Sequence, residues 1–380
     1  MPSIKSEKQE LDINVYEAAK IRLKDIIKTF DKCYVCFSGG KDSLTVLYLM
    51  KECYEEMGIN KPIDVVFRDE ELIPSVVIDF VQEYRKLPWV NMKYYATPMK
   101  SNKALLGKTE DYIQWDANRE WVRPKPDFAI SFEQVSSQYE MDDLMCQGDV
   151  GSVALITGQR CDESMYRLQS VMNSISKPYI ANSGSPRAKL CKPIYDWKED
   201  DIFKFFYDKK IKYCPIYDMQ TFNEQCLRVA TPLHAEASKH IDKLKTLDPV
   251  FYNQLAQIFP EVEVHARYSK DLIGKAEDYD RIIDKYPLGV KGILKYIDDN
   301  LVGHQKELAL KRLRQALVGK RNSMSKHPET FGGYPLRALF IVIIRGGFKR
   351  AIMPIKPSDK DKEYEQKCIE ALKEGTANGS

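Results

Sequence analysis

A Gly-Gly pair joins a predicted strand to a predicted helix near residue 40, and this junction restricts the fold more than any other feature. The motif Ser38-Gly39-Gly40-Lys41-Asp42-Ser43 lies between an apolar run at 34–37 and a helix-like apolar run at 44–50. The glycines permit positive φ, the first N–H groups of the helix lack intrahelical acceptors, and the helix dipole favours negative charge. The junction therefore predicts a phosphate site, with a ligand-free glycine-rich turn as the alternative.

A P-loop is a competing interpretation of the same residues, because Gly40-Lys41 could end the motif G-x-x-x-x-G-K-[ST]. Two residues exclude it. Val35 occupies the position of the first glycine, and Asp42 stands where the motif needs Ser or Thr to hold Mg²⁺. The predicted phosphate site is therefore of another kind.

Strand-like and helix-like segments alternate between residues 30 and 215, which is typical of an α/β fold with a parallel sheet. The predicted strands are 33–37, 63–67, 91–95, 153–157 and 190–194, and the predicted helices are 44–57, 75–86 and 198–208. Ligands of such sheets bind beyond the carboxyl ends of the strands. We expect Ser38, Asp69, Gly158 and Arg160 to meet there.

Residues 100–147 show little β pattern and form a predicted insertion with an aromatic and basic character. Its marked residues are Trp115, Arg119, Trp121, Arg123 and Lys125. An insertion of this length usually forms a lid or a substrate-recognition element. The alternative is that both tryptophans pack the insertion against the sheet.

Two arginines follow the predicted strand at 153–157, in the segment GQRCDESMYR that begins at Gly158. Gly158 would let the backbone approach a nucleotide, and the planar guanidinium groups of Arg160 and Arg167 match phosphate or sulfate oxygens. The alternative is a structural ion pair of Arg160 with Asp162 or Glu163.

Three motifs in order resemble the adenine-nucleotide α-hydrolase-like enzymes, a group that includes ATP pyrophosphatases and phosphoadenylyl-sulfate (PAPS) reductases. The loop at 38–43 resembles their pyrophosphate (PP) loop, S-G-G-x-D-S, and the segment at 158–167 resembles G-x-R-x-x-[EQ]-S-x-x-R. Residues 193–202 resemble P-[IL]-x-D-W-x-x-x-D-[VI], where Asp196 and Glu199 also have the spacing of a helix capping box.

The resemblance spans roughly residues 15–265 and is strongest to the immunoglobulin-binding-regulator A branch of PAPS-reductase-like proteins. The segments that resemble this branch are 69–71, 112–130, 213–218 and 228–236. The resemblance implies binding of ATP, cleavage of its α–β bond and transfer of AMP to a substrate, with Mg²⁺ bridging the phosphates.

The resemblance also implies a set of site residues. The expected nucleotide-binding residues are Ser38, Gly39, Gly40, Lys41, Asp42, Ser43, Arg68, Gly158 and Arg160. The expected catalytic residues are Lys41, Asp42, Asp69, Arg160 and Arg167, and Asp42 is the candidate Mg²⁺ ligand. The candidate general bases are Asp69, Glu70 and Glu163.

The cysteines depart from the pattern of true PAPS reductases. Their catalytic thiol lies in a C-terminal Glu-Cys-Gly-[LI]-His, whereas Cys368 lies in QKCIE, so a reductase would lack its nucleophile. Cys33 and Cys36 should occupy opposite faces of a strand, as core residues. Five further cysteines are too widely spaced to predict an iron–sulfur cluster: Cys146, Cys161, Cys191, Cys214 and Cys226.

Beyond about residue 236 the pattern becomes helical and the charge uneven. Residues 301–357 hold 12 lysines and arginines against 2 glutamates, a local net charge of +10. This excess predicts a surface for a polyanion such as nucleic acid. The alternative is a solvated helix face that balances an acidic partner domain.

The chain of 380 residues is long enough for two domains: an α/β nucleotide-binding domain at 1–235, with the insertion, and a mostly helical basic domain at 236–380. It has no apolar run of the ~20 residues that a membrane span needs, and its nine scattered cysteines suit a reducing compartment. We therefore expect a cytoplasmic protein.

The expected function is that of a PP-loop ATP pyrophosphatase, a hydrolase- and transferase-type enzyme that adenylylates a substrate. The expected acceptor is nucleic acid in a sulfur-modification pathway, such as DNA modification, with a sulfur-carrying protein as a partner. The alternatives are a sulfonucleotide (PAPS) reductase, or a nucleotide-binding regulator with a ParB-like partner, which the resemblance alone implies.

Overall fold

The computed structural model describes residues 12–172, 177–223, 227–235, 237–272, 276–325, 332–348 and 351–377. It divides into two compact units, one formed by residues 1–103 and 111–266 and the other by residues 104–110 and 267–380. Residues 237–266 therefore belong by their contacts to the first unit. The contacts do not show which parts fold independently, so the predicted domain boundary after residue 235 stays a prediction.

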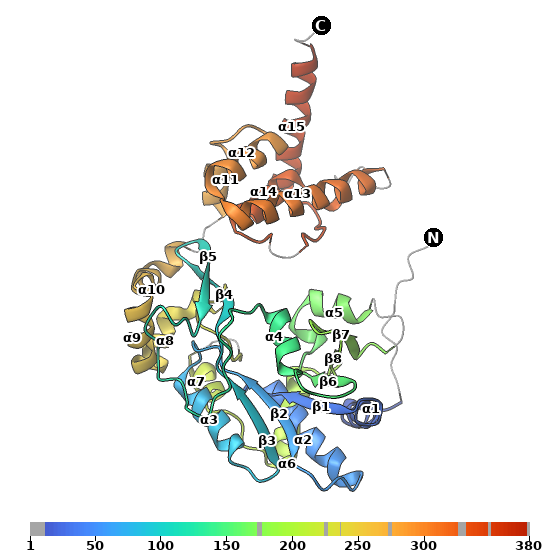
Figure 1. Ribbon diagram of the computed structural model, residues 1–380. Helices are drawn as coiled ribbons and strands as arrows, with labels where there is room; N and C mark the ends of the chain where they lie inside the picture. The colour runs from blue at the N-terminus through green and yellow to red at the C-terminus, as the bar shows by residue number, and fades with distance from the viewer. Residues whose placement is uncertain are drawn as a thin grey trace. The chain divides into compact units, whose positions relative to one another are not determined.

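A six-stranded sheet forms the centre of the first unit (Figure 1), with the strand order β3-β2-β1-β6-β8-β7. The strands are β1 (Lys32–Cys36), β2 (Ile63–Arg68), β3 (Val90–Tyr95), β6 (Val153–Ile156), β7 (Ile180–Asn182) and β8 (Ala188–Cys191). Every neighbouring pair is parallel except β7 with β8. The predicted α/β class with a parallel sheet is confirmed, whereas the short antiparallel β7 was not predicted.

Alternating strand residues divide the core between the two faces of the sheet. Val35 packs with α1 (Val15–Thr29), α2 (Lys41–Glu56), α3 (Ser75–Arg85) and α6 (Glu199–Lys209), and Tyr34 packs on the other face with α4 (Gln138–Met145). Cys33 and Cys36 belong to these two opposite faces, as predicted. Cys33 is buried and Cys36 is half-buried, and burial raises the pKa of the Cys33 thiol to about 11 and that of Cys36 to about 12.

The insertion contains a β-hairpin that the sequence did not predict. It consists of β4 (Met99–Leu105) and β5 (Lys108–Gln114), joined by Leu106 and Gly107 at φ +52° and +72°. Positive φ at both turn positions is the geometry of the two-residue hairpin turns that match strand twist. Asn-Gly or Asp-Gly is the usual sequence signal for such a turn, and this turn has Leu-Gly in its place.

Two predictions about the segment before α6 are wrong in detail. Strand β8 ends at Cys191, so the predicted strand at 190–194 begins too late and runs too far. Helix α6 begins at Glu199 with Lys198 at its N-cap position. The carboxylate of Asp196 instead accepts two hydrogen bonds of 2.7 Å from the guanidinium of Arg22 on α1, which removes it from the cap.

Helices complete both units. Those of the first unit include α5 (Met165–Met172), α7 (Ile216–Phe222), α8 (Ile241–Leu247), α9 (Pro249–Ile258) and the first half of α10 (Glu261–Leu272). The second unit contains α11 (Ala276–Ile283), α12 (Val290–Asn300), α13 (Gly303–Met324), α14 (Leu336–Ile344) and α15 (Asp359–Ala377), packed around Phe340. The expected helical C-terminal region is confirmed. Across the described residues, no helix has the length and apolar character needed to cross a membrane.

Candidate functional site

The loop between β1 and α2 lies where the sheet changes direction. Strand β1 has β2 on one side and β6 on the other, so chain segments leave toward both edges from its carboxyl end. Such a switch point is the usual ligand crevice of an open α/β sheet. Gly39 is required there, because its φ is +74° and a Cβ atom would lie 2.9 Å from Cγ1 of Val77 on α3.

Two serine hydroxyls fix the loop from inside. The hydroxyl of Ser43 accepts the Ser38 N–H at 3.1 Å and donates to the Gly40 carbonyl at 3.0 Å. The hydroxyl of Ser38 lies 3.0 Å from that of Ser43 and accepts the Gly40 N–H at 3.3 Å. The loop is therefore held in one conformation before any ligand binds.

Lys41 is the most enclosed charged group of the loop, with a side chain only 4% exposed. Its ammonium donates to the Leu227 carbonyl at 2.7 Å and lies 3.2 Å from the Glu199 carboxylate. Its backbone N–H donates to the hydroxyl of Tyr217 at 2.7 Å. Burial raises the pKa of Tyr217 far above its usual range, so this hydroxyl stays protonated.

Sequence reasoning missed the roles of Glu199 and Tyr217. Glu199 was considered only as part of a capping box, and Tyr217 only as one letter of the segment 213–218. The only available signal was indirect: the N–H of Lys41, at the first position of the helix, has no intrahelical acceptor and needs one from elsewhere in the chain. The sequence does not say that this acceptor is Tyr217. The next two donors of α2, the N–H groups of Asp42 and Ser43, have no protein acceptor in the described part of the chain.

Gly158 and Arg160 contact the start of α2, so the structure brings together the loop and the second motif. A Cβ atom on Gly158 would lie 2.5 Å from the carbonyl carbon of Asp42, which means that the glycine serves close packing on α2. The Nε of Arg160 donates to the Asp42 carboxylate at 2.6 Å, and the Arg160 side chain is 4% exposed. The alternative pairing with Asp162 also occurs, at 3.4 Å.

Arg167 and Glu163 form an ion pair at the start of α5. The carboxylate of Glu163 also accepts the backbone N–H of Arg160 at 3.3 Å. Arg167 is therefore linked through Glu163 to the loop that carries Arg160.

Asp69 follows β2 but is engaged by the insertion. Its side chain is fully buried, accepts the Tyr94 hydroxyl at 2.5 Å and forms an ion pair with Arg123. The backbone N–H of Glu71 donates to the same carboxylate at 2.9 Å. With its oxygens so occupied, Asp69 anchors the insertion, and this geometry does not favour the expected role as a base.

Arg68 lies on the other face of the sheet. It shares the face of Val66, which packs with α4, and its guanidinium lies 3.9 Å from the Asp142 carboxylate. Burial raises the pKa of Asp142. Because α2 covers the opposite face, the position of Arg68 gives no support to its expected contact with a nucleotide.

Glu71 is the buried charge that sequence reasoning did not single out. Its φ is +62°, an uncommon value for a non-glycine residue, and its side chain is fully buried. Both of its oxygens accept hydrogen bonds of 2.6 Å from the guanidinium of Arg119, and the N–H of Trp115 donates to it at 2.6 Å. Trp115 is itself fully buried, which confirms the packing alternative for this tryptophan, whereas Trp121 is 36% exposed.

The donors around Asp42 do not form a metal site by themselves. One carboxylate oxygen accepts from Arg160, and the other lies 3.5 Å from the Lys41 ammonium. Among the described residues there is no cluster of three or more His, Cys, Asp or Glu side chains that could hold a metal. An Mg²⁺ ion here would take most of its ligands from phosphates and water, as Mg²⁺ often does with nucleotides.

Burial makes most of the described thiols poor nucleophiles. Cys368 is 7% exposed, and burial raises the pKa of its thiol. Burial also raises the thiol pKa of six others, namely Cys33, Cys36, Cys53, Cys146, Cys191 and Cys214. Cys226, one of the five cysteines considered for a cluster, lies outside the described residues.

Comparison with known proteins finds a family whose model matches most of the first unit. Residues 32–282 match the model of the phosphoadenosine phosphosulfate reductase domain. An uncharacterised protein of Escherichia coli K12, YbdN, is 30% identical over 227 residues, which is 55% of each protein. The chain thus spans about half the length of this curated relative.

Several solved structures resemble this chain with low sequence identity and low TM-scores. A PAPS reductase of Candida auris is 15% identical over 53% of this chain and 84% of that one, with a TM-score of 0.32. An FMN adenylyltransferase of Candida glabrata is 14% identical over 56% and 64%, with a TM-score of 0.37. The tRNA thiolase NcsA of Methanococcus maripaludis is 17% identical over 66% and 79%, with a TM-score of 0.31. At these TM-scores the similarities carry no weight for function.

Proposed function

The chain belongs to the phosphoadenosine phosphosulfate reductase domain family, and from that premise we propose that it binds ATP on the loop at 38–43 and breaks the α–β bond. The acceptor attacks the α-phosphorus, the bond from that phosphorus to the bridging oxygen breaks, and pyrophosphate leaves. The products are the adenylylated acceptor and pyrophosphate, and the acceptor's proton passes to solvent or to a nearby base.

The observation that carries the proposal is the set of donors at the start of α2. The free N–H groups of Asp42 and Ser43 point along a helix dipole that favours anions. The protonated hydroxyl of Tyr217 accepts from the Lys41 N–H, so its own hydrogen is available to a phosphate oxygen. The Lys41 ammonium belongs to the same loop, where the Glu199 carboxylate at 3.2 Å balances its charge.

Arg160 supplies the electrostatic part of the mechanism. Its guanidinium is held by Asp42, so it stays next to the loop without the entropy cost of ordering a free side chain. A fixed positive charge at the departing pyrophosphate stabilises the charge that develops there. Arg167 would act from the same segment through its link to Glu163. When bound, Mg²⁺ would neutralise phosphate charge, with Asp42 as the nearest carboxylate.

The acceptor we propose is nucleic acid, and three exposed cations on α13 favour it. Lys311, Arg314 and Arg321 are exposed and recur at three- and seven-residue spacings, so they lie along one side of the helix. Other charges of the basic segment are already neutralised within the second unit. Lys320 pairs with Glu365 at 2.5 Å, and Arg337 pairs with Asp280 at 2.7 Å.

Incubation of the full chain with α-labelled ATP, with and without RNA and DNA, tests the proposed reaction. We expect AMP, free or on the nucleic acid, together with pyrophosphate. Lys41→Ala should abolish turnover, whereas Lys204→Ala, at an exposed lysine of α6, should not. In a parallel incubation with PAPS and a dithiol reductant, sulfite and adenosine bisphosphate would identify a reductase. ATP binding without turnover would favour the alternative of a nucleotide-binding regulator with a ParB-like partner. ADP and phosphate would contradict the proposal.

A further inference from the structure

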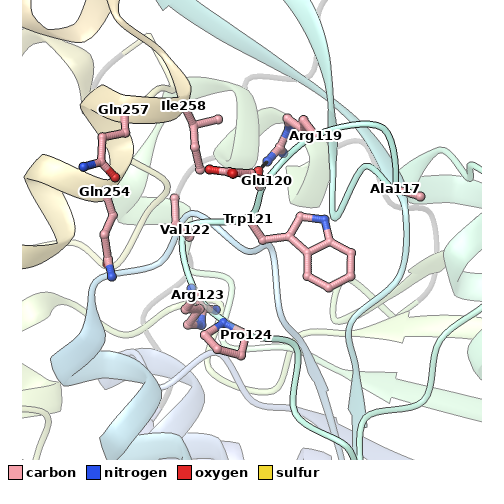
Figure 2. A pocket seen from close by; sticks show the side chains of 10 residues that line it. All are labelled: Ala117, Arg119, Glu120, Trp121, Val122, Arg123, Pro124, Gln254, Gln257 and Ile258. Carbon is pink, nitrogen blue, oxygen red and sulfur yellow. Dashed lines mark hydrogen bonds between the residues drawn. The ribbon is translucent and has the colours of Figure 1, made fainter.

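A pocket of about 600 Å³ lies between the insertion and α9, within the first unit (Figure 2). This volume is in the range of small-molecule sites. One wall comes from residues 117–124 and the other from Gln254, Gln257 and Ile258 of α9. None of these residues belongs to the phosphate loop.

Two buried carboxylates hold the insertion wall rigid. The guanidinium of Arg119 uses its two terminal nitrogens on both oxygens of Glu71 and on the carbonyls of Ile113 and Glu120, the latter two at 2.8 and 2.9 Å. Arg123 is paired with Asp69. Both carboxylates come from the carboxyl end of β2, next to the strand that feeds the phosphate loop. The pocket is therefore anchored to the same edge of the sheet.

The charges around the pocket argue against an anionic ligand. Arg119 and Arg123 are neutralised by Glu71 and Asp69. The nearby Lys125 donates to the hydroxyl of Ser131 at 3.1 Å, and burial lowers its pKa, which weakens its hold on a proton. The two arginines of the pocket therefore offer an isolated phosphate no uncompensated charge.

A partly exposed ring and two amides line the pocket. Trp121 is 36% exposed, and its indole N–H donates to the Asp116 carbonyl at 2.8 Å, which fixes the ring. The ring also contacts Trp115 edge to face, and the Lys125 ammonium lies 4.8 Å from its centre, so a ligand can stack on one face of the ring only. Within the described residues, the side-chain amides of Gln254 and Gln257 form no hydrogen bond. An amide both donates and accepts, which matches the edge of a nucleobase, and an exposed indole offers a stacking face.

We propose that this pocket binds a single planar heteroaromatic base, separate from the ATP phosphates. The base can come from a free nucleotide or from an unpaired position in single-stranded nucleic acid. Its assignment to the acceptor substrate rests on the proposed adenylyl transfer, whereas base binding itself does not. Opening a base pair costs energy, so the pocket should favour single strands over duplex.

Binding without ATP tests this site independently of catalysis. The probes are fluorescein-labelled RNA and DNA octamers, as single strands and as duplexes, followed by anisotropy, and labelled AMP, CMP, GMP and UMP in equilibrium dialysis. Trp121→Ala should weaken binding about 5- to 160-fold, the range for loss of one stacked base, and Trp121→Phe should restore most of it. Gln254→Ala should change the preference among the four bases.

Matched variants separate this site from its neighbours. Tyr207→Ala removes an aromatic side chain that is 84% exposed on α6 and should leave binding unchanged. Lys41→Ala should also leave it unchanged, even if the chain proves inactive toward ATP. Equal binding by Trp121→Ala and the wild type would overturn the proposal. So would a loss of ATP binding in Trp121→Ala, because the pocket would then hold the adenine of ATP.

Discussion

The ion pair between Arg160 and Asp42 should contribute strongly to the stability of the first unit. Arg160 is 4% exposed and Asp42 is 22% exposed, so replacing either one leaves a charge in a largely buried place. Removing one partner of a buried pair costs about 3–5 kcal/mol. Asp42 would keep some water and the Lys41 ammonium at 3.5 Å, so we expect Arg160→Met to cost about 2–3 kcal/mol, below that range.

A double-mutant cycle pairs Arg160→Met with Asp42→Asn, and Asp42→Asn should lower the free energy of unfolding further than Arg160→Met. Asp42→Asn leaves the guanidinium of Arg160 with only weaker contacts, to the Asp162 carboxylate at 3.4 Å and to the Trp197 carbonyl at 3.5 Å, and we expect a loss of about 3–4 kcal/mol. The double variant should lose less than the two single losses combined, with a coupling energy of about 1–3 kcal/mol. The sequence offered a structural ion pair of Arg160 only with Asp162 or Glu163, whereas the shortest pair is with Asp42 at 2.6 Å.

Urea unfolding of the full chain, followed by tryptophan fluorescence, measures these effects in the first unit. Its residue ranges contain all four tryptophans, Trp89, Trp115, Trp121 and Trp197. Arg68→Met is the matched control, because Arg68 is 32% exposed and lies 3.9 Å from its partner, and it should cost about 0–1 kcal/mol. If Arg160→Met were as mild as Arg68→Met, the structural role of the pair would be refuted.

Three further predictions address the loop, the basic helix and pH. Gly40→Val should weaken ATP binding at least about tenfold in calorimetry, because a Cβ there would lie 3.2 Å from the Tyr217 hydroxyl; unchanged affinity would place the phosphates elsewhere. Replacing Lys311, Arg314 and Arg321 with Ser should reduce the slope of log affinity against log salt concentration for duplex DNA by about 2–3, measured by anisotropy. An unchanged slope would mean that these residues form a solvated helix face and do not bind phosphates. Burial lowers the pKa of His265 below 6.5, so the unfolded state takes up a proton before the folded state does as the pH falls. The free energy of unfolding should therefore drop between pH 7.5 and 5.5, and it should drop less in His265→Gln. Equal pH profiles of the variant and the wild type would contradict this.

Local sequence signals predicted the sheet and the loop because both depend on short-range patterns. The apolar strands and the Gly-Gly junction are readable within about ten residues, and the parallel order follows from the helices between them. The hairpin was missed because its turn is Leu106-Gly107 and its strands are mostly polar. A turn that depends on positive φ at a leucine has no common sequence signature.

Side-chain partners distant in sequence could not be predicted in the same way. Asp42 pairs with Arg160, which is 118 residues away, and the Lys41 N–H meets a hydroxyl 176 residues away. Asp196 had the right spacing for a cap, yet the competing guanidinium of Arg22 decided its role. Tertiary contacts of this kind override local rules, and they occur where this site is built.

A structure of the chain with the non-hydrolysable analogue α,β-methylene ATP tests the central claim most directly. We predict that its β- and γ-phosphate oxygens lie within hydrogen-bond distance of the N–H groups of Asp42 and Ser43 and of the Tyr217 hydroxyl, with the Arg160 guanidinium beside the bridging position. Phosphates bound more than a few ångströms from the loop at 38–43 would contradict the account.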